Sequence, residues 1–213
     1  MVLGPAQATL IVKITASGTI TSGDDNSGEL TGAPGSIAGQ TVEVVQTLTA
    51  GPLATVDLVN DPSLSFFDLV SLSVTVGASG PRLFVPAAGD GASSHFIDSA
   101  STLLDSQMTM LLGTDTLTSI VHVVSGLITQ ASPLQSYSFV GGFASSGSFV
   151  SADRFDENGD ALWQFLVADT GLRSILVEVT NDVPEPPALL LVPLALVLVR
   201  VGRGQRQGVG GRG

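Results

Sequence analysis

Four oxygen-bearing side chains fall within the short stretch of residues 153–160. They are Asp153, Asp156, Asn158 and Asp160. Calcium takes six to eight oxygen ligands, and carboxylates and amide carbonyls are its usual protein donors. The spacing departs from the helix-loop-helix calcium loop, because the twelfth position counted from Asp156 is Val167 instead of a glutamate. Two interpretations stay open, an ordinary acidic turn and a calcium site, and the stretch suggests no other cofactor.

A second acidic stretch is SGDDNSGELTG, residues 22–32. Its Asp24, Asp25, Asn26 and Glu29 could ligate a cation, but the Gly- and Ser-rich context favours a solvated loop. Acids are numerous enough for two of them to meet as the carboxylate pair of a glycosidase. No spacing in the sequence selects such a pair.

Motifs of enzymatic catalysis are missing from the chain. Cysteine is absent, which removes thiolate catalysis and Cys-ligated metals, and only two histidines occur. His122 lies in the apolar segment SIVHVVS, where we expect a partly buried structural residue, and His95 follows two serines in an expected polar loop. There is no G-x-S-x-G, no H-E-x-x-H and no Gly-rich loop followed by lysine. The sequence therefore predicts a protein that is not an enzyme.

The elements that must position these residues are strands. Segments rich in Val, Ile, Thr and Phe alternate with clusters of Gly, Pro, Asp and Ser, and no helical pattern recurs. The strand-like segments are residues 8–20, 39–49, 69–77, 119–128, 136–143, 147–155, 161–168 and 173–180. This pattern predicts an all-β fold, an antiparallel β-sandwich of jelly-roll type.

Two local features refine this prediction. Asn158-Gly159 lies between two strand-like segments and predicts a tight hairpin turn, because both residues tolerate positive φ. Residues 93–113 are ambiguous, since their leucines and methionines fit a short helix as well as a strand over 107–113. Trp163 and Tyr137 are the only large amphipathic aromatics in the sequence. We expect Trp163 in the core and Tyr137 on a strand face. A sugar-binding platform usually needs more such residues.

Charge is unevenly distributed. Four of the eight bases lie at Arg200 or later, so residues 1–199 carry four cations against all 19 acids, or 4 − 19 = −15. A body of this charge repels nucleic acid and anionic lipid, so we expect no nucleic-acid partner.

The C-terminal segment combines three features in order. Prolines end the last strand-like segment, because proline donates no hydrogen bond to a sheet. The motif is Val183, Pro184, Glu185 and Pro186. An uncharged run follows, with Ala188, Leu189, Leu190, Leu191, Val192, Leu194, Leu196, Val197, Leu198 and Val199 as its apolar members. Arg200, Arg203 and Arg206 come next. The run is short for a membrane span, which takes about 20 residues, and the arginines predict a cytoplasmic tail.

This segment resembles the PEP-CTERM sorting signal of exported proteins of Gram-negative bacteria. The resemblance implies recognition of the Pro-Glu-Pro tripeptide by an exosortase, a membrane processing enzyme, and a transient anchor in the inner membrane. It further implies delivery of the folded body to the cell surface or the exopolysaccharide matrix. Two departures are the shortness of the apolar run and the glycines between the arginines.

The expected organisation is therefore a β-sandwich over residues 9–182, a sorting signal with a hydrophobic helix over 183–213, and a short leader remnant over 1–8. Ala6-Gln7-Ala8 has the A-x-A form found before a signal-peptidase cut, although the charged and apolar regions of a signal peptide do not precede it. We expect the true start to lie upstream, and a chance match is the alternative.

The predicted function is that of an exported, non-catalytic structural or adhesive protein, with extracellular polysaccharide as a possible partner. The alternatives are a secreted module that binds carbohydrate or calcium and a secreted polysaccharide hydrolase.

Overall fold

The computed structural model describes residues 9–49, 64–87, 91–98, 103–124, 136–143 and 146–182, and in these ranges its regular elements are all strands. The strands are β1 (Thr9–Thr19), β2 (Ser22–Asp25), β3 (Gly35–Ser36), β4 (Thr41–Thr49), β5 (Leu64–Val76), β6 (Arg82–Phe84), β7 (Gly91–Asp98), β8 (Leu103–Leu112), β9 (Asp115–Val124), β10 (Tyr137–Val140), β11 (Phe149–Phe155), β12 (Ala161–Ala168) and β13 (Leu172–Asp182). The described ranges hold no helix long and apolar enough to cross a membrane. The expected leader remnant, sorting motif, apolar helix and basic tail fall on residues 1–8 and 183–213, outside the described residues.

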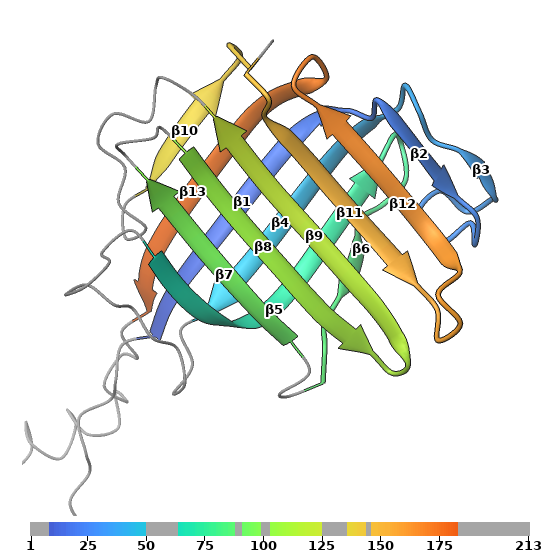
Figure 1. The fold of residues 1–213 in the computed structure, drawn as a ribbon, viewed down its shortest axis with the longest axis horizontal. Helices are drawn as coiled ribbons and strands as arrows, with labels where there is room; N and C mark the ends of the chain where they lie inside the picture. Colours follow the sequence, from blue (N-terminus) through green and yellow to red (C-terminus); the bar gives the residue numbers. More distant parts are fainter. Residues whose placement is uncertain are drawn as a thin grey trace, which may run out of the picture. The chain divides into compact units, whose positions relative to one another are not determined.

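The strands of residues 9–181 form two antiparallel layers, as the sequence predicts for a sandwich-like fold (Figure 1). Sheet A has the order β10-β13-β1-β4-β5, and sheet B has the order β5-β7-β8-β9-β11-β12-β2-β3. Strand β5 belongs to both, because residues 68–76 pair with β4 and residues 64–67 pair with β7. The short β6 also pairs with β5.

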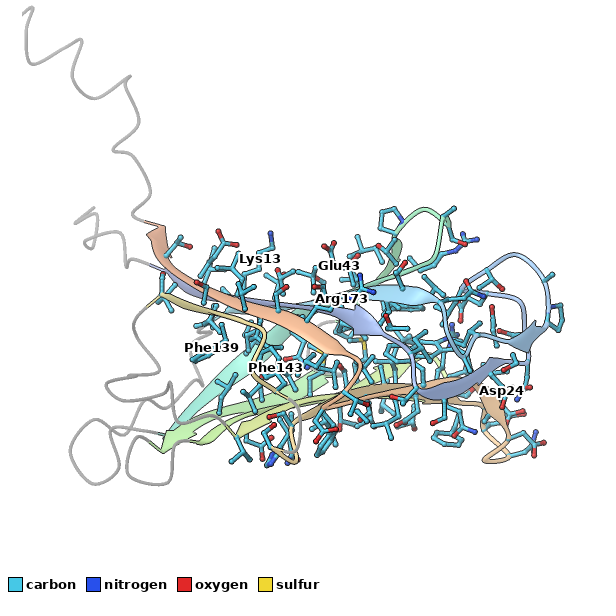
Figure 2. The ribbon with its side chains drawn as sticks, turned by 90° about the horizontal axis from the view of Figure 1, so that it is seen from above. Lys13, Asp24, Glu43, Phe139, Phe143 and Arg173 are labelled. Atoms are coloured by element: carbon cyan, nitrogen blue, oxygen red, sulfur yellow. The ribbon has the colours of Figure 1, made fainter. Side chains whose placement is uncertain are left out.

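Alternation of apolar and polar residues explains why these segments are strands with one face buried. In β4 every second side chain from Val42 to Leu48 is buried, and β9 shows the same period from Leu117 to Val123. A period of two places such residues on one face of a strand. The buried faces of the two sheets meet, and Figure 2 shows Phe139 and Phe143 between the layers.

One polar contact bridges the two sheets inside this core. Gln46 of sheet A donates its side-chain amide to the Ser119 hydroxyl of sheet B at 3.1 Å. Its side-chain carbonyl accepts a hydrogen bond from Ser106 at 2.8 Å. All three side chains are fully buried. Because each of these buried polar groups has a partner, the bridge fixes the offset of the sheets without leaving an unpaired group.

The chain passes between the sheets where β1 leads into β2 and β12 leads into β13. The amide of Thr19 donates to the carbonyl of Gly171 at 2.8 Å, and the amide of Thr21 donates to the carbonyl of Leu166 at 2.8 Å. A Cβ atom at Gly18 would lie 2.7 Å from the Gly171 carbonyl, and one at Gly171 would meet the carbonyl oxygen of Thr19. Glycine is required at this corner because two backbones approach each other too closely for a side chain.

The hairpin predicted around Asn158-Gly159 is confirmed as β11, a turn and β12. The turn is longer than two residues, because Asp156 and Asp160 close it through an amide-to-carbonyl bond of 3.0 Å. Gly159 has φ 83° and donates to the Asp156 carbonyl, as in a type I turn followed by a glycine bulge.

Residues 91–98 and 103–112 are the strands β7 and β8, so the strand alternative for 107–113 is confirmed. The expected polar loop at His95 is wrong, because this residue lies in β7 and pairs in register with Ser65 and Ser106. Small and polar residues form a strand here because the neighbouring strands β5 and β8 supply the backbone partners.

Candidate functional site on the outer face of sheet B

The expected solvated loop over residues 22–32 is in fact built around a buried carboxylate. Asp25 is fully buried, and its Oδ2 accepts hydrogen bonds from the amides of Leu30 and Thr31 at 2.9 Å each and from the Thr31 hydroxyl at 3.0 Å. Its Oδ1 accepts one from Ser27 at 3.3 Å. All of these donors come from the loop itself, so Asp25 holds the loop together.

Glu29 of the same loop is tied to the hairpin. Its Oε2 accepts the indole N–H of Trp163 at 2.7 Å, and its Oε1 pairs with Arg154 at 2.5 Å. Arg154 reaches Asp115 as well, at 2.7 Å, and its guanidinium carbon lies 5.9 Å from the centre of the Phe84 ring. Trp163 is fully buried, which confirms its expected place in the core. Arg154 thus pairs with two carboxylates, and its bond to Glu29 joins the loop to the sandwich.

The predicted calcium ligands divide between the turn and the strand. Asp156 accepts hydrogen bonds from the amides of Asn158 and Asp160 at 2.9 Å each, and these bonds, that of Asp160 first, lower the pKa of Asp156. Asp153 lies before the turn, in β11. Among the described residues no group of three or more acidic or histidine side chains is placed to hold a metal ion. The calcium site stays a prediction.

Strand pairing gathers other polar residues into one row on sheet B. In register across β9, β11, β12 and β2, the row consists of Thr118, Asp153, Gln164 and Asp24. Trp163 and Phe165 on either side of Gln164 are buried, so the row lies on the outer face. Figure 2 shows Asp24 on the lower layer, whereas Lys13, Glu43 and Arg173 lie on the upper one.

Three members of this row, Asp153, Gln164 and Asp24, border a hollow of about 350 Å³ between β2, β11 and β12. The described residues that contribute are Ser22, Gly23, Asp24, Ser151, Ala152, Asp153, Gln164, Phe165 and Leu166. None of them is cationic. The side chains of Asp24, Asp153 and Gln164 make no hydrogen bond or ion pair with any described residue. They are therefore free to bind a ligand.

Asp153 is the least favourably placed of these side chains. Burial raises the pKa of its carboxyl above the ordinary value, and no hydrogen bond offsets this effect. Removing a carboxylate from water without a partner disfavours its charged form. A polar group that the fold does not use, held where it costs stability, is a candidate for a role in binding.

Comparison with known proteins gives no match to a family model, a curated protein or a solved structure.

The structure unites one residue of each predicted acidic stretch, Asp24 and Asp153, around a third residue that sequence reasoning missed, Gln164. A signal for Gln164 was present. The sequence predicts Trp163 in the core, and the next residue of a strand faces the opposite way. Ser22 and Ser151 were missed for lack of any local signal.

The chemistry of the row suits hydroxyl groups. Each aspartate carboxylate has two acceptor oxygens with about four lone-pair sites, and the Gln164 amide both donates and accepts. Neighbouring strands lie about 4.8 Å apart, so the row presents planar polar groups at a regular repeat. A ligand with many hydroxyls along its length can satisfy several of them at once.

Proposed function

We propose that the protein is an exported adhesive protein whose sheet B binds polysaccharide through the row of Asp153, Gln164 and Asp24. The observation that carries the proposal is that these three side chains line one hollow and make no hydrogen bond or ion pair with a described residue. By contrast, Asp25, Glu29 and Asp115 are all occupied by hydrogen bonds or ion pairs. The proposed role is to bind the polysaccharide without cleaving it, in agreement with the lack of catalytic motifs in the sequence.

The charge of the hollow restricts the ligand. Asp24 and Asp153 border it without a cationic neighbour in its lining, so an anionic polymer would be repelled. A neutral glycan meets no such repulsion, and its hydroxyls can donate to the carboxylates. We therefore propose a neutral polysaccharide as the partner. Nucleic acid is excluded by the same argument.

Export and sorting complete the proposal. Val183, Pro184, Glu185 and Pro186 would be recognised by an exosortase-type enzyme, and residues 188–199 would anchor the chain transiently in the inner membrane. Support comes from the order of tripeptide, apolar run and arginines in the sequence. A hydrophobic helix in this segment and a jelly-roll arrangement of the two sheets stay predictions.

Binding is tested with the full chain and a panel of soluble polysaccharides. Neutral glucans, xylan and galactomannan are compared with anionic alginate by calorimetric titration. We expect at least one neutral polymer to bind. The double variant Asp153→Ala/Gln164→Ala should abolish the heat of binding. Binding of alginate alone, or of no polymer, contradicts the proposal. Release of reducing ends would instead indicate the hydrolase alternative, with Asp24 and Asp153 as the carboxylate pair.

Sorting is tested in a host that carries an exosortase. The full chain and a chain ending at residue 182 are expressed, and the cells are fractionated. We expect the full chain at the surface and the truncated chain in the periplasm. Truncation removes both the Pro-Glu-Pro motif and the apolar run. The variant Glu185→Ala in the full chain changes the motif alone, so it tests recognition separately from anchoring. Equal distribution of all three forms contradicts the sorting proposal.

A further inference from the structure

A second hollow lies on the same outer face, beside the first. It measures about 330 Å³ and is lined by Gly147, Ser148, Phe149, Leu166, Ala168 and Asp169. Leu166 lines both hollows and is 37% exposed, so the two adjoin at this residue of β12. The first hollow is bordered by polar groups, whereas Phe149, Leu166 and Ala168 give the second an apolar floor.

Phe149 has one ring face covered and one open. It pairs in register with His122 of β9 on one side and with Ala168 of β12 on the other. The His122 ring stacks on it, with the ring centres 5.0 Å apart and the planes at 21°. The second hollow is lined by residues of β12 and includes none of β9, so it lies on the other side of the ring. The methyl group of Ala168 is too small to fill that side.

We infer that the space between Phe149 and Ala168 is a stacking subsite for a sugar ring, and that the two hollows together bind a neutral β-linked glucan-type chain. This inference rests on the proposed function and names its ligand class. A β-linked glucopyranose carries its hydroxyls around the rim and C–H groups on both flat faces. The apolar face packs against the open side of Phe149, and the rim hydroxyls of the next units reach Asp153 and Gln164.

The dimensions and charge favour this occupant. From Gln164 to Ala168 the strand advances four residues, about 13 Å at about 3.3 Å per residue. This length exceeds a single sugar ring and suits a short oligosaccharide that runs along β12. Asp169, Asp153 and Asp24 border the path and no lining residue is cationic, so a uronic acid polymer does not fit.

His122 is a positioning residue in this arrangement. Its imidazole holds Phe149 upright from the β9 side, and its Nδ1 lies 3.9 Å from Oδ1 of Asp105, its cross-strand partner. That oxygen is buried and accepts no hydrogen bond from a described residue. A ring packed on one side in this way presents a rigid face on the other, which lowers the conformational entropy lost on binding.

The test titrates the full chain with β-1,4-linked gluco-oligosaccharides of one to six units, with α-1,4-linked oligosaccharides of the same lengths for comparison. We expect affinity to rise with length for the β-linked series only. Ala168→Leu fills the open side of the ring and should weaken binding of the longer chains roughly five- to tenfold, as expected for loss of one stacked aromatic contact. Phe149→Ala should weaken it to a similar degree.

Leu176→Ala, at an exposed leucine on sheet A outside both hollows, is the control and should leave affinity unchanged. The stacking subsite would be overturned if Ala168→Leu and Phe149→Ala both bind with wild-type affinity. If Asp153→Ala loses binding at the same time, the proposed polysaccharide binding would still stand. Equal binding of the α-linked series would overturn the ligand class. Failure of the wild-type chain to bind any polymer of the wider panel would overturn the proposed function as well.

Discussion

The carboxylate of Glu29 and the indole N–H of Trp163 are joined by a hydrogen bond of 2.7 Å. The two residues lie 134 positions apart in the sequence, and the contact fastens the loop of residues 26–34 to the hairpin of β11 and β12. Glu29 also pairs with Arg154 through its other oxygen, so one side chain contacts both strands of the hairpin. Glu29 is therefore an acid whose contacts stabilise the fold. Asp153 and Asp24 differ, because their side chains make no hydrogen bond or ion pair with a described residue.

Replacement of Glu29 should therefore destabilise the protein. In Glu29→Ala the indole N–H of Trp163 loses its acceptor, and an unpaired buried donor costs about 1–3 kcal/mol. Glu29→Gln retains an acceptor for Trp163 and should cost less. Urea unfolding measures both, and the fluorescence of Trp163, the only tryptophan, should change in Glu29→Ala. Exposed Glu43 supplies the control Glu43→Ala, and equal effects of Glu29→Ala and Glu43→Ala would contradict the junction.

The buried bridge of Gln46 gives a second test. Gln46→Leu leaves the hydroxyls of Ser106 and Ser119 without their partner and should cost about 1–3 kcal/mol of unfolding free energy. Adding Ser106→Ala and Ser119→Ala removes the unpaired hydroxyls and should restore most of the loss. Chemical denaturation of the single, double and triple variants measures the coupling. Additive losses would show that the three side chains act independently.

Gly171 tests the close approach at the corner. A Cβ atom there would overlap the carbonyl oxygen of Thr19, and backbone cannot move aside as a flexible side chain can. Gly171→Ala should lower the unfolding free energy by about 1–3 kcal/mol, as overpacking does. Gly80 is a suitable control, since nothing lies within 4 Å of a Cβ built on it. If Gly171→Ala and Gly80→Ala have the same melting temperature, the corner is not constrained as described.

Most strands could be predicted from the sequence, and the reasons are local. Val, Ile and Phe at alternate positions identify β4, β9 and β12, and the glycine of the β11–β12 turn marks the hairpin. β2, β3 and β7 could not be predicted, because their Gly, Ser and Asp residues disfavour strands. Pairing with a neighbour decides their conformation.

The candidate site was only half visible in the sequence. Asp153 and Asp24 each belong to an acidic stretch, but the two stretches are separate in the sequence. Their meeting depends on the order β11-β12-β2, a non-local pairing that no spacing reveals. The open side of Phe149 depends in the same way on Ala168 being its partner across the strands. Residues that share a face of one strand can be read from alternation, whereas the neighbours on the next strand cannot.

The pKa of Asp153 predicts a pH dependence of stability. Burial raises this pKa in the folded protein above its value in the unfolded chain, so the folded state binds the proton more tightly. Stability therefore falls as pH rises from about 3.9, the ordinary value, through the raised pKa of the folded state. Asp153→Asn removes this penalty and should raise the melting temperature at neutral pH.

Melting curves of wild type and Asp153→Asn from about pH 3 to about pH 8 measure the effect, because the difference between them should vanish at the acidic end. A variant that is no more stable than wild type at neutral pH would show that the carboxylate carries no penalty.

The most direct test of the binding face is a map of amide chemical shifts during titration of the full chain with a β-1,4-linked gluco-hexaose. We predict saturable shifts in the amides of Asp24, Ser151, Gln164 and Ala168 on sheet B, and none in Thr15 or Ser73 on the outer face of sheet A. Shifts confined to sheet A, or no shifts with any neutral oligosaccharide, would contradict a glycan-binding role for the outer face of sheet B.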